Sequence, residues 1–256
     1  MRVQPTPELR LPPRKAPPAL DLAGYALFLD FDGTLVDIAP RPHSVIVSDD
    51  LRTLLVRLNH ALAGATALLS GRTITDIDVT LGIALPNIAG VHGHELRRDG
   101  HFLRDKSDGA AMRAAAEDLR ALDRRTMLPA LVENKGASLA LHYRHAPDSA
   151  NEVHRIARDI AKTHGLTLLE GKMVVELLAS AITKGDALAE FMQERAFASR
   201  TPIMIGDDLT DEHAFESARA LGGFGIFVGA ARESAADFTL PHPTAVRAWL
   251  AAGLTQ

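Results

Sequence analysis

The 256-residue sequence contains no cysteine. This absence excludes a thiolate nucleophile, a disulfide framework, an iron–sulfur cluster and a zinc site built from cysteines. Long apolar runs are missing as well. None approaches the about 18 residues that a membrane span needs, and the first residues lack the apolar segment of a secretory signal. We therefore expect a soluble, cytoplasmic protein without a membrane partner.

An excess of positive charge is also lacking, since 28 Lys and Arg face 32 Asp and Glu, for a net charge of −4. Surfaces that bind nucleic acid are basic, so we expect no nucleic-acid partner. The composition is otherwise ordinary for a globular protein, with 46% hydrophobic and 23% charged residues. The length suits one large domain, or a core with an inserted module.

Prolines concentrate at the start of the chain, where residues 1–20 hold six of the fourteen. Proline can neither donate a hydrogen bond to a sheet nor continue a helix, so residues 1–21 are predicted to form an extended, mobile tail. A docking peptide for a proline-binding partner is the alternative interpretation.

From residue 25 the sequence alternates between two patterns. Residues 25–29 form a short apolar run that ends at Asp30, which is typical of a strand buried on both faces. Residues 48–62 carry an apolar stripe with helical spacing. Two further short strands are predicted over 65–69 and 87–90. This alternation predicts an α/β fold with a Rossmann-like parallel sheet.

The alternation breaks in the middle of the chain. Helices are predicted over 110–122 and 152–163, and strands over 138–143 and 173–177. Two helices with interleaved strands form an α+β unit, so we expect an inserted α+β cap domain over 99–180.

The α/β pattern resumes near Lys184, with strands predicted over 203–206 and 225–228. We therefore expect the core domain to comprise residues 22–98 and 181–256. No internal repeat is evident.

Two acids follow the first predicted strand, in the segment DFDGT at residues 30–34. Carboxylates at Asp30 and Asp32 are costly at the end of a buried strand unless something binds them. Their oxygens suit Mg²⁺. One carboxylate can also attack phosphorus while the other transfers the proton of the leaving alcohol. The alternative is an acidic turn that caps the next helix.

A second acidic segment, GDDLTDE at residues 206–212, follows the strand predicted over 203–206. Acids gathered at the carboxyl edge of a parallel sheet require a counter-ion, which Mg²⁺ would supply. Enrichment of acids at a helix N-terminus is the alternative, and it accounts for Asp211 better than for Asp207.

Two weaker signals lie between these segments. Ser70, in the tripeptide SGR, ends the second predicted strand, where its hydroxyl can bond a phosphoryl oxygen. Lys184 opens a predicted helix and can neutralise phosphate charge. Taken alone, the segment at Ser70 can instead be an ordinary helix N-cap before Thr73, and a lone lysine such as Lys184 is more often a surface residue.

In this order, the four segments resemble the haloacid dehalogenase superfamily of phosphotransferases over about residues 25–240. The resemblance implies that Asp30 is the nucleophile and Asp32 the general acid/base, while Ser70 and Lys184 hold the phosphoryl group. Magnesium would lie on Asp30, Asp207 and the backbone carbonyl of Asp32. Two neighbouring acids, Asp208 and Asp211, would lie around these metal ligands without binding the ion directly.

Within the predicted cap, charged residues interrupt apolar strands, and surface ion pairs are the alternative reading. The pattern resembles the trehalose-6-phosphate phosphatase family. The segments that carry the likeness are ENK at 133–135, HYR at 142–144, GK at 171–172 with Glu176, HGHE at 92–95, and GDDLTDEHAF at 206–215.

This family resemblance implies hydrolysis of a phosphosugar, trehalose 6-phosphate, to trehalose and phosphate. The residues implied in binding it are Glu133, Lys135, Arg144, Lys172, Glu176, Arg72 and His92. Around 177–183 the sequence departs from the family pattern, at the return from cap to core. The family also implies a functional link to a trehalose-phosphate synthase.

Three other interpretations stay open. The same core could serve another sugar phosphate, such as sucrose 6-phosphate, or a phosphosugar sensor that has lost catalysis. A zinc site among His92, His94, His142 and His145 is disfavoured, because no helix carries two of them at ligand spacing. A hinge or substrate role suits His92 better.

Overall fold

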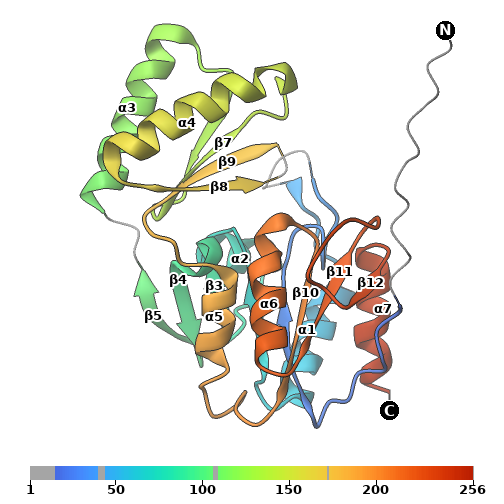
Figure 1. Ribbon diagram of the computed structural model, residues 1–256. Helices are drawn as coiled ribbons and strands as arrows, with labels where there is room; N and C mark the ends of the chain where they lie inside the picture. Colours follow the sequence, from blue (N-terminus) through green and yellow to red (C-terminus); the bar gives the residue numbers. More distant parts are fainter. Residues whose placement is uncertain (1–14, 40–43, 106–108, 172, 256) are drawn as a thin grey trace, which may run out of the picture.

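A computed structural model describes residues 15–39, 44–105, 109–171 and 173–255. The backbone forms two sheets that lie one above the other (Figure 1). Each sheet has its own buried hydrophobic cluster. Within the described residues, no helix has the length and apolar character needed to cross a bilayer.

The larger sheet has eight strands in the order β12-β11-β10-β1-β2-β3-β4-β5. Its parallel strands are β1 (Tyr25–Leu29), β2 (Thr66–Leu69), β3 (Ile88–Gly90), β10 (Thr201–Gly206), β11 (Phe224–Val228) and β12 (Phe238–Leu240). An antiparallel hairpin, β4 (Glu95–Arg98) and β5 (His101–Asp105), extends one edge. The parallel α/β core predicted from the sequence is confirmed.

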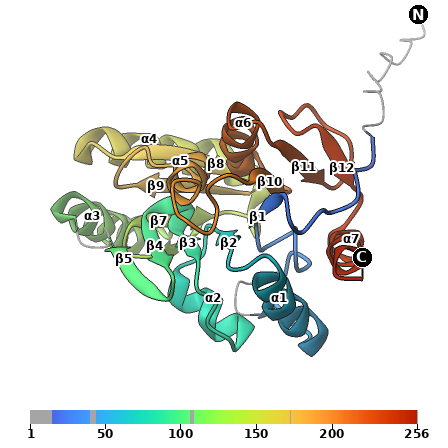
Figure 2. The same cartoon turned by 90° about the horizontal axis from the view of Figure 1, so that it is seen from below.

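Helices cover both faces of this sheet (Figure 2). On one face lie α1 (Asp49–Ala61), α2 (Ile74–Leu81) and α7 (Pro243–Gly253), and on the other α5 (Lys184–Phe191) and α6 (Glu212–Ala220). Because both faces are covered, the central strand β1 is apolar throughout and almost wholly buried. The side chain of Ser48 caps α1 by accepting from the Leu51 amide, as expected for a serine at this position.

The smaller sheet is antiparallel, with the order β6-β7-β9-β8. Its strands are β6 (Leu131–Asn134), β7 (Ser138–His142), β8 (Thr167–Gly171) and β9 (Val174–Leu178). Two helices, α3 (Ala110–Thr126) and α4 (Ala150–His164), cover the face turned away from the larger sheet (Figure 1). The opposite face of the smaller sheet overhangs the core and is free to line a site.

The structure differs from the expected boundaries in one place. Strand β5, His101–Asp105, belongs to the eight-stranded sheet, whereas the sequence placed it in the cap. The turn at Asp99 and Gly100, both with positive φ, folds β5 back on β4 before the chain leaves the core. The division into a core and a cap remains our proposal, with the cap starting after Asp105.

The proline-rich segment expected to be mobile over 1–21 lies largely outside the described residues. Its described part packs on the core. The Lys15 carbonyl accepts from the Thr239 amide at 3.1 Å, the Pro18 carbonyl accepts from the Trp249 indole at 2.9 Å, and Leu20 is buried. These contacts cover the β12 edge of the sheet.

Candidate active site

A cleft of about 1430 Å³ lies between the two sheets. From the core it is lined by the strand ends after β1, β2 and β10 and by α2, and from the cap by β6, β7, β8 and β9. The sequence-predicted residues that line it are Asp30, Asp32, Ser70, Arg72, His92, Glu133, Lys135, Arg144, Glu176, Lys184, Asp207 and Asp208. The carboxyl ends of parallel strands therefore meet the cap at one cavity, where ligand sites of α/β folds lie.

The floor of the cleft holds a buried cluster of charges around Lys184. The Lys184 ammonium donates to Asp30 Oδ1 at 2.7 Å and to Asp211 Oδ1 at 2.6 Å. All three side chains are nearly inaccessible to solvent. Carboxylate oxygens of Asp30, Asp207 and Asp211 lie within 4.8 Å of one another. One ammonium thus faces three carboxylates, which fits a site completed by a cation.

Gly33 is required for this geometry. Its φ of +85° is a left-handed conformation, and a Cβ at this position would lie 2.1 Å from Asp207 Oδ2. The glycine of the DxDGT segment therefore lets the turn after β1 approach the turn after β10.

Burial and repulsion act together on the acids of this cluster. Burial first, and then the neighbouring Asp211 charge, raises the pKa of Asp30 to about 7 despite the opposing effect of Lys184. Burial together with Asp30 and Asp211 raises the pKa of Asp207 to about 9. Burial lowers the pKa of Lys184, but the carboxylates of Asp211 and Asp30 outweigh it and hold that pKa above its ordinary value.

Asp211 is more central than its expected supporting role. It is fully buried, and its second oxygen accepts from the amides of Asp207 and Asp208 at 3.0 Å each. Asp208 caps the same turn by accepting from the Leu209 amide. Acid enrichment at a helix start had offered a simpler reason for Asp211. Its contact with Lys184, 27 residues away, could not be read from local spacing.

Ser70 and Arg72 occupy the turn after β2. Ser70 is 1% exposed, and its hydroxyl accepts from the Arg72 amide at 3.1 Å. The Arg72 guanidinium bonds both oxygens of Asp32, with Nε–Oδ2 at 2.6 Å and Nη2–Oδ1 at 2.7 Å. This pairing was not foreseen from the sequence.

The cap contributes a second buried cluster, centred on Glu176 of β9. Lys135 donates to Glu176 Oε1 at 3.0 Å and also to the Gly71 carbonyl of the core at 3.0 Å. Ser138 donates to Glu176 Oε2 at 3.2 Å. Burial opposes the charge on Glu176, yet Lys135 and His92 outweigh it and hold the Glu176 pKa well below its usual range.

His92 enters this contact from a strained turn. It and Val91 are consecutive non-glycine residues with positive φ, 45° for Val91 and 56° for His92, which is sterically costly for a β-branched residue. The His92 ring is buried, and its Nε2 lies 3.4 Å from Glu176 Oε2. Within the described residues, neither ring nitrogen makes a hydrogen bond of normal geometry. The turn therefore directs an imidazole at the junction of core and cap.

The remaining cap residues lie nearer the mouth of the cleft. Glu133 pairs with His142 at 2.8 Å, and this hydrogen bond holds the pKa of Glu133 below its usual value. Arg144 donates to the Ala39 carbonyl of the core at 3.4 Å. Lys172 lies outside the described residues. His142, the last residue of β7, is the partner that the sequence did not assign.

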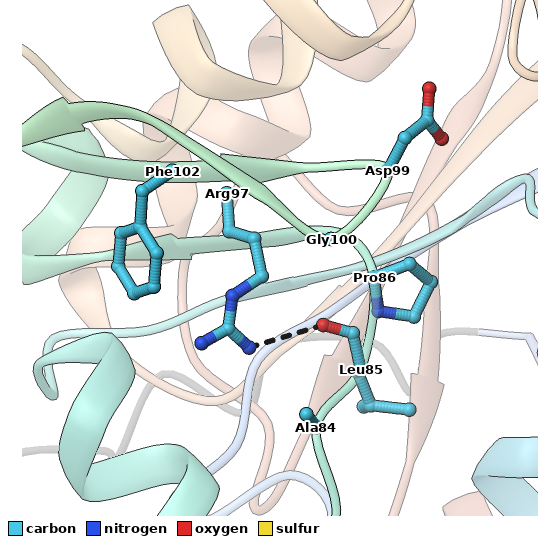
Figure 3. A pocket seen from close by; sticks show the side chains of 7 residues that line it. All are labelled: Ala84, Leu85, Pro86, Arg97, Asp99, Gly100 and Phe102. Carbon is cyan, nitrogen blue, oxygen red and sulfur yellow. Dashed lines mark hydrogen bonds between the residues drawn. The ribbon is translucent and has the colours of Figure 1, made fainter.

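A smaller hollow of about 300 Å³ lies beside the β4–β5 hairpin (Figure 3). Its one guanidinium, Arg97, is buried and pairs with Asp78, and it also donates to the Leu85 carbonyl at 3.3 Å. Phe102 lies against the same guanidinium, 4.7 Å from the ring centroid. Because this arginine is already engaged, the hollow offers a ligand no free guanidinium, and the sequence-predicted site residues line the larger cleft.

Comparison with known proteins points to one family. Residues 28–244 match the family model described as trehalose-phosphatase. The chain is 39% identical to a probable trehalose-phosphate phosphatase of Sinorhizobium fredii, over 91% of this chain and 88% of that protein. It is 38% identical to trehalose-6-phosphate phosphatase of Escherichia coli, over 81% of this chain and 78% of that protein.

Solved structures show the same fold at lower identity. The C-terminal domain of C. albicans trehalose-6-phosphate phosphatase superimposes with a TM-score of 0.79 at 20% identity, covering 93% of this chain and 98% of that one. A haloacid dehalogenase-like hydrolase from Bacteroides thetaiotaomicron gives 0.63 at 16% identity, covering 90% and 98%. The fold is therefore that of the haloacid dehalogenases, and the chain belongs to the trehalose-phosphatase family.

Proposed function

We propose that this protein hydrolyses trehalose 6-phosphate to trehalose and inorganic phosphate, through a phosphoryl group carried transiently by Asp30. The observation that carries the proposal is the buried contact between Lys184 and Asp30 at the floor of the cleft, 2.7 Å long. Membership of the trehalose-phosphatase family supports the choice of substrate. The overhanging, charged face of the cap supports a polar leaving group such as a sugar.

In the first step, a carboxylate oxygen of Asp30 forms a bond to phosphorus while the bond from phosphorus to the sugar oxygen breaks. Asp32 supplies the proton that the departing sugar oxygen takes up. Lys184 and the hydroxyl of Ser70 hold the phosphoryl oxygens. In the second step, Asp32 takes a proton from a water molecule while the water oxygen forms a bond to phosphorus. The bond between phosphorus and the Asp30 oxygen breaks.

A divalent cation fits the acids beside Asp30. The donors are all oxygens and lie within 4.8 Å of one another, and burial, followed by the neighbouring carboxylates, raises the pKa values of Asp30 and Asp207. We propose Mg²⁺ as the ion, held by Asp30, Asp207 and the Asp32 carbonyl, with Asp208 and Asp211 in support. When bound, it would offset the charge of the phosphoryl group.

Cap residues are proposed to recognise the sugar. Glu133, Lys135 and Glu176 would contact hydroxyl groups, and Arg144 and Lys172 would contact sugar or phosphate. His92 would join this set at the junction of core and cap. We also propose a cytoplasmic location and a functional link to a trehalose-phosphate synthase, which would supply the substrate.

The test is phosphate release from trehalose 6-phosphate, glucose 6-phosphate and sucrose 6-phosphate, each with Mg²⁺ and with EDTA. We expect the highest kcat/KM for trehalose 6-phosphate, loss of activity in EDTA and its return with excess Mg²⁺. Equal rates on all three sugars would defeat the disaccharide assignment. Undiminished activity after exhaustive chelation would contradict the proposed dependence on Mg²⁺.

A further inference from the structure

Arg72 is bound to Asp32 through a two-point contact. Its Nε reaches Oδ2 at 2.6 Å and its Nη2 reaches Oδ1 at 2.7 Å, so the planar guanidinium engages both carboxylate oxygens. The Arg72 side chain is 10% exposed and the Asp32 side chain 35% exposed. The contact thus lies at the wall of the cleft, with Asp32 on the open side.

The guanidinium has two further contacts. Nη1 lies 3.5 Å from Thr80 Oγ1, and the guanidinium carbon lies 5.5 Å from the Phe31 ring centroid. A phosphoryl group could bind the Nε–Nη2 edge of Arg72 only by displacing Asp32. This geometry disfavours the substrate-binding role that the family resemblance implied for Arg72.

The backbone that carries Arg72 is held from three sides. The Arg72 amide donates to Ser70 Oγ, and the Arg72 carbonyl accepts from the Val91 amide at 2.8 Å. Lys135, from the cap, donates to the adjacent Gly71 carbonyl at 3.0 Å. A guanidinium on so fixed a turn can hold a flexible partner in one orientation.

We propose that Arg72 is a positioning residue that orients the Asp32 carboxylate for proton transfer, and that it does not bind the phosphoryl group. The inference rests on the proposed function, in which Asp32 is the general acid/base. A carboxylate has about four acceptor positions. Arg72 takes one on each oxygen, and the others stay directed at the cleft.

The protons transferred in the two steps balance, and Arg72 gives up none. The proton that Asp32 delivers to the sugar oxygen in the first step is replaced by the one it takes from water in the second. Arg72 stays protonated throughout, as expected for a guanidinium, and burial is outweighed by Asp32, which raises its pKa further.

The test is a double-mutant cycle on kcat for trehalose 6-phosphate, with Asp32→Asn, Arg72→Gln and the combination. If Arg72 acts only through Asp32, Arg72→Gln lowers kcat about 100-fold with KM nearly unchanged. The double variant is then no slower than Asp32→Asn. Arg72→Lys keeps the positive charge but cannot make the two-point contact, so its kcat should stay below a tenth of the wild-type kcat.

Competitive inhibition by inorganic phosphate supplies the second readout. Arg72→Gln should leave the phosphate inhibition constant within about threefold of wild type, which also shows that the variant retains a folded site. The control is Arg155→Gln, at an exposed ion pair with Asp159 on α4, which should leave kcat unchanged.

The outcomes separate the two proposals. Multiplied losses in the double variant, or a phosphate affinity that falls tenfold or more in Arg72→Gln, would overturn the role of Arg72 while leaving the proposed function intact. Normal turnover by Asp32→Asn would instead overturn the proposed function and, with it, this inference.

Discussion

Two buried clusters of charge face each other across the cleft, and they are balanced differently. The core cluster, formed by Asp30, Lys184, Asp207 and Asp211, sets three acids against one ammonium. The cap cluster sets Glu176 against Lys135 at 3.0 Å, and nearer the mouth of the cleft the half-buried Glu133 pairs with His142 at 2.8 Å, so each of these acids has a basic partner.

The pKa values follow this difference. Burial and like charges raise those of Asp30 and Asp207, whereas partners lower those of Glu133 and Glu176. The core cluster therefore has more negative than positive charge unless a cation binds there, whereas the acids of the cap are already paired with bases. The first is built to bind and react, and the second to hold a shape that a polar substrate can meet.

The largest effect is expected where the core cluster carries the proposed nucleophile. Asp30→Asn should lower kcat for trehalose 6-phosphate by at least about 10⁴-fold, because an amide cannot form the covalent intermediate. Initial-rate measurements of phosphate release check this. Asp49→Asn, at an exposed acid on α1, is the matched control and should keep wild-type activity. Normal turnover by Asp30→Asn would end the proposed mechanism.

The next effect tests whether the cap cluster depends on pairing. Glu176→Gln leaves Lys135 buried without its carboxylate, so the free energy of unfolding should fall by about 3 kcal/mol. KM for trehalose 6-phosphate should rise while KM for 4-nitrophenyl phosphate, which lacks a sugar, changes little. Denaturant unfolding and steady-state kinetics measure the two.

Removing both partners provides the control for this cluster. In the variant that combines Glu176→Gln with Lys135→Met, most of the lost stability should return, because no buried charge is left uncompensated. If the stability losses of the two single variants add in the double variant, Glu176 and Lys135 do not stabilise the cap as a pair.

A smaller effect should reveal the imbalance of the core cluster. The folded-state pKa values of Asp30 and Asp207 lie above their ordinary value of 3.8, at about 7 and about 9. The folded protein therefore retains protons that the unfolded chain has lost. In EDTA, stability should fall as pH rises from about 5 to about 9, while Mg²⁺ should remove the fall.

Thermal unfolding across this pH range, with and without Mg²⁺, checks the expectation. Asp207→Asn removes one of the two acids and should flatten the EDTA profile. A wild-type profile in EDTA that is flat, or that rises with pH, would contradict the imbalance.

The smallest effect belongs to a charge pair outside both clusters. Arg155 and Asp159 lie 3.3 Å apart on α4, with side chains 63% and 68% exposed. Arg155→Ala should change the free energy of unfolding by no more than about 0.5 kcal/mol, since water screens an exposed pair. A loss of 2 kcal/mol or more would mean that burial is not what separates the two clusters from surface ion pairs.

Much of the fold could be predicted from the sequence because its signals are local. Apolar runs of strand length that end in acids predicted the parallel sheet, and the change of pattern predicted an α+β unit in the middle. Strand β5 was misplaced because no local signal in residues 101–105 distinguishes a strand of the core sheet from a strand of the cap sheet. Only hydrogen bonding to β4 assigns it to the core.

The sequence by itself determined which residues could do chemistry: acids at Asp30 and Asp207, each directly after a buried strand, and a lysine opening a helix. It also determined the family, since the order of these segments survives in a linear comparison.

Only the tertiary structure decided which charged side chains form pairs. Lys184 meets Asp30 across 154 residues, Arg72 binds Asp32 across 40, and Lys135 holds Glu176 across 41. Such pairings depend on how strands and cap pack. A charge's partner is set by distance and burial in space, and spacing along the chain does not encode it.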